Sequence, residues 1–398
     1  MRGDRPWLTI VGIGEDGVEG LSAAARAAIA SATFVVGGHR HLALADALIR
    51  GERLAWPTPL AEAIPTILAR RGSPVTVLAS GDPFCFGIGN TLARHVPLGE
   101  FIAIPAPSAF SLACARLGWA LQDVETISFC GRPLEVLRPL LTAGNFILAL
   151  SADAKTPAAV AALLAEWGFA ETRLTVLEAL GGPAEKISIF NGLEAIHPLN
   201  LMALEVAGGP ALPLAAGLDE DWFETDGQIT KQEIRALTIA ALAPKRGDVL
   251  WDIGAGSGSV GIEWMLRHPA NRTIAIEARP DRAERVARNA RALGVPALDV
   301  RQGRAPEALE GLAVPDAIFI GGGASNAAIS AHCWSVLPPG GRLVINAVTL
   351  PTERLIMARQ AEWGGRLTRI GIERLEPIGP MQGFAPARTV LQYRAVKP

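Results

Sequence analysis

The sequence has few cysteines and no excess of charge of one sign. Its 4 cysteines are scattered through 398 residues, without a C-x-x-C pair or the His spacing of a zinc site, so we expect reduced thiols and no metal. The formal net charge is -2, which provides no general basic field to hold nucleic acid by its phosphates. We therefore expect no nucleic-acid partner.

Signals for export and membrane insertion are also missing. The first residues, MRGDRPWLTIVGIGEDG, lack the continuous apolar stretch and the cleavage site of a signal peptide. No later segment reaches the ~18 consecutive apolar residues that a membrane span needs. We expect a soluble, cytoplasmic protein without a membrane partner.

What the chain does have is length and apolar content. Its 398 residues exceed one compact core, and 49% of them are hydrophobic, as in ordinary α/β domains. Short β-rich runs alternate with Ala- and Leu-rich helical patterns, which predicts strands joined by crossover helices. In the first half we expect strands at 8–12, 33–36, 75–79, 101–104, 126–129 and 146–150, then closely spaced antiparallel strands at 174–178, 186–190 and 200–206.

An uncharged segment rich in Gly, Pro and Ala, AGGPALPLAAGL at 207–218, indicates a linker. It predicts one domain over 1–207, a linker over 208–217 and a second domain over 218–398. A helix after Thr230 and a series of strands predict a doubly wound second domain. These strands are expected at 249–253, 273–277, 298–301, 317–320 and 343–346, with two terminal strands after them.

The strongest local motif is the glycine loop that follows the first strand of the second domain. Gly256-x-Gly258-x-x-Gly261 matches the dinucleotide fingerprint, and Glu277 follows at a strand end, where the ribose of either a dinucleotide or S-adenosylmethionine would be held. Asp252 favours S-adenosylmethionine, because a carboxylate repels a pyrophosphate but attracts sulfonium and ammonium groups. A turn without a ligand fits less well, since closely spaced glycines cost backbone entropy.

Two glycine loops in the first half carry weaker signals. Gly12-Ile-Gly14-Glu-Asp-Gly17 follows a strand, but Glu15 and Asp16 inside the loop oppose a dinucleotide. The second loop, ASGDP at 79–83, could present its backbone to a ligand or could be an ordinary turn.

The GGHRH segment contains His39 and His41, an i, i+2 pair that could suggest a metal. Because no acidic residue stands beside the pair, we interpret both side chains as exposed or structural.

The first half of the chain resembles the tetrapyrrole (precorrin) methylases. Four motifs carry this resemblance, which are, in order, LTIVGIGEDG, LASGDPFCFGIG, PAPSAFSLACARLGW and FCGRP. The second half resembles the precorrin-specific class of Rossmann-like methyltransferases. The motifs that carry this resemblance are ITKQEIRA, WDIGAGSGSVGIEW, AIEARPDRAERVARNA, GRAPEAL and PDAIFIGGG. The fusion of the two is similar to the precorrin-6Y C5,15-methyltransferases (decarboxylating) of cobalamin biosynthesis, over nearly the whole chain.

The resemblance implies a fold, a reaction and a donor. The fold is a tetrapyrrole-methylase domain of two α/β subdomains followed by a Rossmann-like class I methyltransferase domain. The reaction is methylation of a precorrin at C5 by the first domain, and C15 methylation with decarboxylation of the C12 acetate by the second, giving precorrin-8. Each domain would bind S-adenosylmethionine. Apart from the resemblance, we expect a homo-oligomer.

The resemblance also implies cofactor-binding residues. In the first domain these are Gly12, Gly14, Gly81, Asp82, Ser108 and Ala109. In the second they are Thr230, Gly254, Ala255, Gly256, Ser257, Gly258, Glu277, Gly303 and Ala305, to which the charge argument above adds Asp252.

Three positions depart from the family pattern. Glu15 and Asp16 replace the usual Pro-Gly of the first loop, so no contacts are assigned to them. Cys130 stands where a His is expected, so no imidazole role is assigned there. Arg304 replaces an acidic residue, so only backbone contacts are expected from the 303–305 turn.

The substrate's carboxylates call for Arg and Lys side chains, which bind carboxylates through charge-assisted hydrogen bonds. The candidates for substrate binding are Arg132, Lys231 and Arg235, with solvated surface charge as the alternative for each. No catalytic acid or base is assigned, because the methyl group to be transferred is already activated on sulfur.

Three other functions stay open on the residues alone. A methyltransferase acting on RNA or protein would share the Rossmann half, although the charge balance disfavours RNA. A dinucleotide-dependent oxidoreductase is disfavoured by Asp252. A non-catalytic tetrapyrrole carrier would bind a precorrin with no requirement for S-adenosylmethionine.

Overall fold

The computed structural model describes residues 6–193 and 195–398. Residues 1–5, on which the export prediction partly rests, lie outside the described residues. The chain divides into two compact units, the first made of residues 1–132 and 142–210 and the second of residues 133–141 and 211–398. The division at 210 and 211 falls within the predicted linker.

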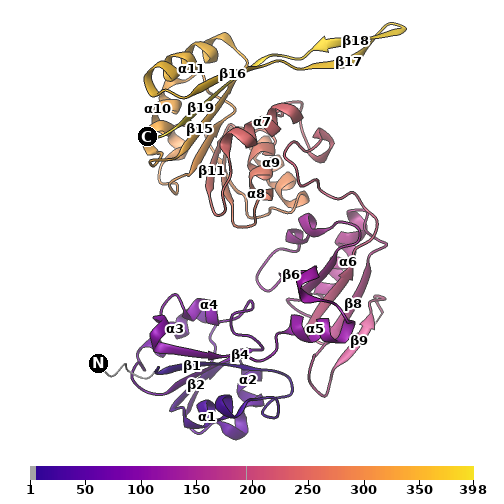
Figure 1. Cartoon of the computed structure of the whole chain (residues 1–398), viewed down its shortest axis with the longest axis vertical. Coiled ribbons are helices and arrows are strands. Elements are labelled where there is room, and N and C mark those ends of the chain that lie inside the picture. Colours follow the sequence, from indigo (N-terminus) through magenta and orange to yellow (C-terminus); the bar gives the residue numbers. More distant parts are fainter. Residues whose placement is uncertain (1–5, 194) are drawn as a thin grey trace. The chain divides into compact units, whose positions relative to one another are not determined.

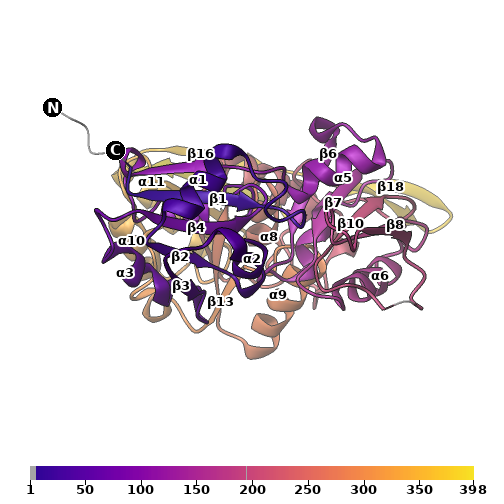
Figure 2. The same ribbon diagram turned by 90° about the horizontal axis from the view of Figure 1, so that it is seen from below.

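The first unit begins with a five-stranded parallel sheet (Figure 1). Its strands are β1 (Leu8–Ile13), β2 (Phe34–Gly37), β3 (Glu52–Ala55), β4 (Val75–Ser80) and β5 (Phe101–Ile104), in the order β3-β2-β4-β1-β5. Figure 2 shows β1, β4, β2 and β3 following one another across this sheet. Strand β3 was not predicted, because its sequence ERLA is half polar and lies at an edge.

Helices cover both faces of this sheet, because successive strand residues point to opposite sides. Ile10, Val36 and Val77 pack with α3 (Ala63–Leu68) on one face. Their neighbours Val11, Val35 and Leu78 pack with α1 (Ala23–Ser31) and α2 (His39–Leu44) on the other. A short helix, α4 (Gly89–Leu92), follows the β4 loop.

A second five-stranded sheet completes the first unit. Its strands are β6 (Val124–Ser128), β7 (Phe146–Leu150), β8 (Arg173–Glu178), β9 (Lys186–Ile189) and β10 (Asn200–Glu205), in the order β6-β7-β10-β8-β9. Only the β6–β7 pair is parallel, which confirms the antiparallel addition predicted for the later strands. The helices α5 (Ala109–Leu117) and α6 (Thr156–Glu166) belong to this half.

The second unit contains a seven-stranded sheet. Its strands are β11 (Val249–Ile253), β12 (Arg272–Glu277), β13 (Asp299–Gln302), β14 (Ala317–Ile320), β15 (Arg342–Ala347), β16 (Arg366–Ile370) and β19 (Val390–Val396). The order is β13-β12-β11-β14-β15-β19-β16, with β19 antiparallel to both of its neighbours. This arrangement confirms the predicted doubly wound fold, in which ligands bind beyond the carboxyl ends of the parallel strands.

Helices sandwich this sheet as well (Figure 1). One face packs with α7 (Gln232–Leu242), α8 (Ser259–Leu266) and α9 (Pro280–Ala292). The other packs with α10 (Ala327–Val336) and α11 (Leu350–Trp363). The fold class predicted from the sequence is therefore confirmed in both units.

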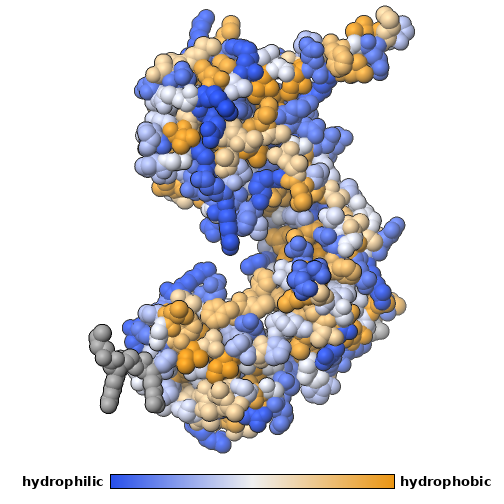
Figure 3. Space-filling view, viewed as in Figure 1, coloured by the Kyte–Doolittle hydropathy of each residue, from blue (hydrophilic) through white to orange (hydrophobic). Residues whose placement is uncertain are grey.

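The prediction of two terminal strands was wrong, since four strands follow β15. Between β16 and β19 the chain forms a hairpin of β17 (Glu373–Ile378) and β18 (Met381–Pro386), which pair only with each other. Leu375, Ile378, Met381 and Phe384 on it are between 54% and 70% exposed. In Figure 3 this hairpin carries patches coloured as hydrophobic.

Short 3₁₀ helices connect several of these elements, at Asp46–Leu48, Leu60–Glu62, Leu98–Glu100, Leu121–Asp123, Leu134–Leu140, Glu220–Trp222 and Glu307–Leu309. Among the described residues, no helix combines the length and the apolar character needed to cross a membrane.

Candidate functional site

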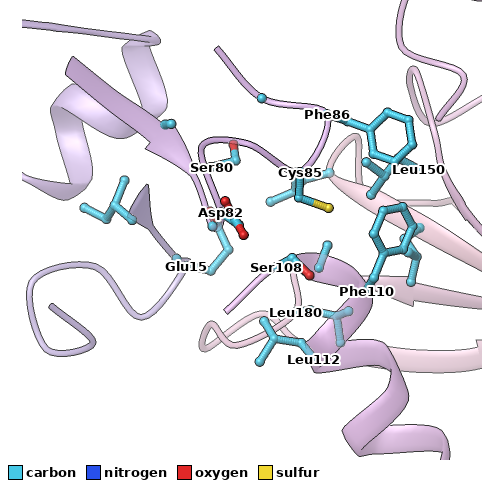
Figure 4. Close-up of a pocket in the computed structure, with 18 of the residues that line it drawn as sticks. Glu15, Ser80, Asp82, Cys85, Phe86, Ser108, Phe110, Leu112, Leu150 and Leu180 are labelled. Atoms are coloured by element: carbon cyan, nitrogen blue, oxygen red, sulfur yellow. The ribbon is translucent and has the colours of Figure 1, made fainter. Parts of the chain in front are cut away.

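The first unit encloses a cavity of about 390 Å³ between the loops that follow β1, β4 and β5 and the second sheet. The structure brings together five of the predicted cofactor residues on its lining, namely Gly14, Gly81, Asp82, Ser108 and Ala109. In Figure 4 Glu15, Ser80 and Asp82 lie on one side of this space, and the rings of Phe86 and Phe110 lie on the other. The cavity therefore has one polar side and one apolar side.

Backbone hydrogen bonds join the loops that form this cavity. The Gly81 N–H donates to the Ile13 carbonyl at 3.1 Å, and the Ala106 N–H donates to the Gly81 carbonyl at 3.1 Å. A Cβ on Gly12 would lie 1.8 Å from the Gly81 carbonyl oxygen and 2.6 Å from the Ala106 nitrogen. Gly12 does not line the cavity, and its lack of a side chain allows the three loops to touch.

Two of the predicted polar residues, Asp82 and Ser108, already accept hydrogen bonds from the backbone nearby. An Asp82 carboxylate oxygen accepts a hydrogen bond from the Phe84 N–H at 2.8 Å. The Ser108 hydroxyl caps α5 by accepting from the Ser111 N–H at 3.1 Å. Both side chains thereby fix the path of the backbone at the edge of the cavity.

A polar cluster on the same wall was missed by the sequence analysis. Arg40 donates to Glu15 and to the Ser80 hydroxyl, the latter at 2.8 Å. The His41 Nε2 lies 2.9 Å from an Arg40 nitrogen and 2.8 Å from the Ser80 oxygen. Because a guanidinium can only donate, this Nε2 is the acceptor and the ring is neutral. Burial, together with the charge of Arg40, lowers the pKa of His41 to about 4.

His39 is exposed, and His41 is hydrogen-bonded within the fold and also lines the cavity, which was not predicted. The signal was available, because GGHRH follows β2 at the carboxyl edge that also carries the β1 and β4 loops. Among the described residues, no group of three or more His, Cys, Asp or Glu side chains is placed to hold a metal ion.

Arg132, the substrate-binding candidate of this unit, is exposed and does not line the cavity. Its guanidinium carbon lies 5.5 Å from the centroid of the Phe86 ring, which does line it. The side chain is thus next to the cavity rather than inside it.

The second unit holds a cavity of about 440 Å³ at the carboxyl ends of β11, β14 and β15. Of the predicted residues, Thr230, Lys231, Gly254, Ala255 and Gly256 line it. A Cβ on Gly254 would lie 2.6 Å from the Cα of Gly322. The glycines again allow two loops to meet through their backbones.

Glu277, at the end of β12, organises the glycine loop. One of its carboxylate oxygens accepts from the Gly256 N–H at 2.8 Å, and the other accepts from the Arg279 N–H at 3.0 Å. The Glu277 carbonyl also accepts from the Gly303 N–H at 2.9 Å, which brings the 303–305 turn beside the loop. Ala305 is partly buried against the core.

Asp252 and the loop residues Ser257 and Gly258 are buried and do not line the cavity. One Asp252 oxygen accepts from the Gly261 N–H at 3.0 Å, and the other has no partner among the described residues. Burial raises the pKa of Asp252 to about 7, and the charge of Glu277 adds to this shift. The Ser257 carbonyl accepts from the Asn289 side chain at 2.8 Å, which holds the loop onto α9.

The predicted substrate role of Arg235 is corrected by the structure. Its side chain is fully buried, pairs with Glu263 at 2.5 Å and also donates to the carbonyls of Thr230 and Leu218. The guanidinium has no exposed donor for a substrate carboxylate. Arg235 instead fixes the backbone before α7, including Thr230 on the cavity lining.

Four cations line the second cavity, of which the sequence analysis named only Lys231. The other three are Arg282 on α9, Arg374 on β17 and Arg388 in the loop before β19. No carboxylate stands among the lining residues in the described parts of the chain. Carboxylates outside the lining pair with three of these cations, and Arg388 has no ion pair among the described residues, so an anionic group of a ligand fits at this position.

Comparison with known proteins follows the division into two halves. Residues 7–194 match the tetrapyrrole (corrin/porphyrin) methylase family, and residues 221–397 match the precorrin methyltransferase domain family. The chain is 53% identical to a precorrin-6Y C(5,15)-methyltransferase [decarboxylating] of a Sinorhizobium species, over 98% of this chain and 97% of that protein.

A protein of the same name from Mycobacterium tuberculosis is 39% identical, over 98% of this chain and all of that protein. A crystal structure of the C-terminal domain of precorrin-6Y C5,15-methyltransferase from Rhodobacter capsulatus is 46% identical. It covers 47% of this chain and 100% of the other, with a TM-score of 0.45.

Gly12→Ala tests the contact between the loops of the first unit. We expect it to lower the free energy of unfolding by about 1–3 kcal/mol, because the added carbon overlaps the Gly81 carbonyl and the loops must separate. Urea denaturation followed by circular dichroism measures the change. Gly99→Ala is the control, since its Cβ would meet open space, and it should leave the stability within about 0.5 kcal/mol. Equal midpoints for Gly12→Ala and wild type would contradict this assignment.

Asp252→Asn tests the buried carboxyl through the pH dependence of stability. The pKa of Asp252 is raised from an ordinary value of 3.8 to about 7, so the folded state holds this proton more tightly than the unfolded state does. The carboxyl therefore destabilises the fold increasingly as the pH rises from about 4 to about 7, by up to about 4 kcal/mol. Asn cannot ionise, so the stability of wild type minus that of Asp252→Asn should fall over this range.

Urea titrations at several pH values measure this difference. The exposed carboxylate of Asp221, also in the second unit, gives the matched control, and Asp221→Asn should track wild type between pH 5 and 8. If the Asp252→Asn and wild-type curves run parallel, Asp252 does not titrate in this range.

Proposed function

The chain belongs to the family of precorrin-6Y C(5,15)-methyltransferases (decarboxylating), and we propose that it methylates a precorrin at C5 and C15 and removes the C12 acetate carboxylate, giving precorrin-8 in cobalamin biosynthesis. The observation that supports this proposal best is the presence of two dissimilar methylase domains, each with its own cavity at the carboxyl ends of parallel strands. The family uses S-adenosylmethionine, and we propose one donor site in each unit.

In the first unit, we propose that the donor lies against Gly14, the 81–82 turn and the 108–109 segment, for methylation at C5. Gly12 contributes by letting these backbones converge. The apolar side of the cavity carries the rings of Phe86 and Phe110, which meet edge to face with centroids 5.8 Å apart and offer aromatic contact to a conjugated ring system.

In the second unit, we propose that the donor lies over the loop 254–258, near Thr230 and the 303–305 turn, for methylation at C15. Each Glu277 oxygen already accepts one backbone hydrogen bond and has a second lone pair for a ribose hydroxyl. Below the loop, Asp252 supplies a carboxylate that a sulfonium or ammonium group would favour in its charged form.

Bound S-adenosylmethionine supplies a methyl group that is already activated on sulfur. The residues of each cavity therefore have to hold the substrate carbon in line with the S–CH₃ bond and exclude water, which can contribute up to roughly 7–11 kcal/mol in favourable cases. This requirement explains why the proposed sites consist of backbone loops rather than an acid–base pair.

The decarboxylation breaks the bond between the acetate methylene and its carboxylate carbon. The electron pair passes into the conjugated imine system of the macrocycle, and a proton replaces the CO₂ on the methylene. We assign this step to the second unit, and we retain Lys231 and Arg132 as candidates for substrate carboxylates.

We also propose that the chain forms a homo-oligomer. The hairpin β17–β18 supports this, because its exposed apolar side chains lie on strands with free edges. A second copy would cover them. Light scattering should give a mass above that of one chain, and Phe384→Asp should lower it. A wild-type mass of 41.8 kDa would contradict the proposal.

Three further points stay predictions of the sequence. They are the domain boundaries 1–207, 208–217 and 218–398, the cytoplasmic location, and the absence of a nucleic-acid partner.

Variants that fill one cavity test whether each unit carries out one of the two methylations. Gly256→Arg places a long side chain on the donor loop of the second unit, and Ala109→Arg does the same in the first. Each variant is incubated with precorrin-6B and isotopically labelled donor, and the product is weighed by mass spectrometry. Gly256→Arg should lose C15 methylation, whereas Ala109→Arg should still decarboxylate and add a single methyl group.

Circular dichroism confirms that each variant is folded before its product is interpreted. If folded Ala109→Arg still adds both methyl groups, the first unit is not a methylase and the proposal of two sites is wrong.

A further inference from the structure

The cations of the second cavity differ in whether a carboxylate neutralises them. Lys231 pairs with Glu220, and Arg282 pairs with Asp226 at 2.9 Å. The hydrogen bond from Arg282 lowers the pKa of Asp226 to about 2, so this pair stays ionised. These two cations are therefore already engaged within the unit.

Arg374 is also engaged. Its guanidinium binds both carboxylate oxygens of Glu233 on α7, one of them at 3.2 Å. This two-pronged contact orients the side chain and ties the base of the hairpin to α7.

Arg388 differs from the other three. It is exposed, and it forms no ion pair or hydrogen bond with any residue that the structure describes. Its backbone is nevertheless well fixed, because the Ala387 N–H donates to the Ile372 carbonyl at 2.8 Å and Val390 is buried at the start of β19. A guanidinium on an anchored segment thus faces the cavity without a counter-charge.

We propose that Arg388 binds a carboxylate of the macrocycle that remains on the product, and so positions the ring over the donor loop. This inference rests on the proposed function of the second unit. A guanidinium presents parallel N–H groups that match the two oxygens of a carboxylate, and Arg388 is the lining cation whose donors are free among the described residues.

The carboxylate that leaves as CO₂ belongs elsewhere in the same cavity. A guanidinium stabilises a carboxylate anion and therefore opposes its loss, whereas an apolar surface removes water from it and favours its loss. Ile234, Phe319 and Val348 provide such a surface on the lining. Arg388 acts on substrate binding, and the step that releases CO₂ does not depend on it.

Steady-state kinetics of the full-length protein test this assignment. With saturating S-adenosylmethionine and a varied precorrin substrate, Arg388→Ala should raise KM about 10- to 100-fold, the size expected for loss of a charged hydrogen bond. The value of kcat should change less than about threefold, and the ratio of decarboxylated to C15-methylated product should not change. Arg388→Lys keeps the positive charge but loses the parallel N–H groups of the guanidinium, so it should give an intermediate KM.

The matched control is Arg246→Ala. Arg246 is likewise exposed and unpaired within the described parts of the chain, but it does not line the cavity. Its KM should equal that of wild type, and calorimetry should show unchanged donor affinity in both alanine variants. Unchanged KM in folded Arg388→Ala would overturn the inference, as would a faster or slower decarboxylation relative to methylation.

Equilibrium binding of the precorrin, followed by tryptophan fluorescence, separates this inference from the proposed function. If wild type binds the precorrin without turning it over, the proposed function fails, and weaker binding by Arg388→Ala still supports the role of Arg388. If wild type does not bind the precorrin, both fail.

Discussion

Both cavities depend on the same constraint, the contact of two loop backbones at a point where no side chain fits. In the first unit Gly12 meets the carbonyl of Gly81, and in the second Gly254 meets the Cα of Gly322. Each contact lies where parallel strands end, so the loops that follow neighbouring strands converge and present backbone groups to one space. A single added carbon at either point would push the loops apart and remove the surface that we assign to the donor.

The two cavities differ in the charge of their linings. This difference fits the proposal that each cavity holds the same substrate for a different reaction. In the first, Arg40 is paired with Glu15 and His41 is neutral, so the lining offers an apolar side and little net charge. In the second, carboxylates outside the lining pair with Lys231, Arg282 and Arg374, and Arg388 is left without a counter-charge among the described residues. The first site therefore depends more on shape, and the second more on the carboxylates of the macrocycle.

Much of the fold could be predicted because the strands are apolar runs that end at glycine loops. The cavity residues that could be predicted are those on these loops, where one motif places several residues together. Arg388 could not be predicted, because it reaches its cavity from the turn after a hairpin and no local pattern encodes that approach. Arg40 lies in the GGHRH segment, whose place after β2 was an available signal.

The prediction that Arg235 binds the substrate was wrong for a different reason. It precedes the buried residues Thr238, Ile239 and Leu242 by three, four and seven positions, which is the spacing of one helix face. Its charge suggested exposure, but its position on α7 predicted burial. The fully buried Glu263, which lies on α8, is what makes a buried arginine possible there.

The central claim is that one chain carries two donor sites, and calorimetric titration of the intact protein with S-adenosylmethionine tests it most directly. Two equivalents should bind per chain. In Glu277→Ala one of them should weaken by about one to two orders of magnitude, because the ribose loses a charged acceptor and the Gly256 N–H loses its partner. Binding of a single equivalent by the folded wild-type chain would contradict the account.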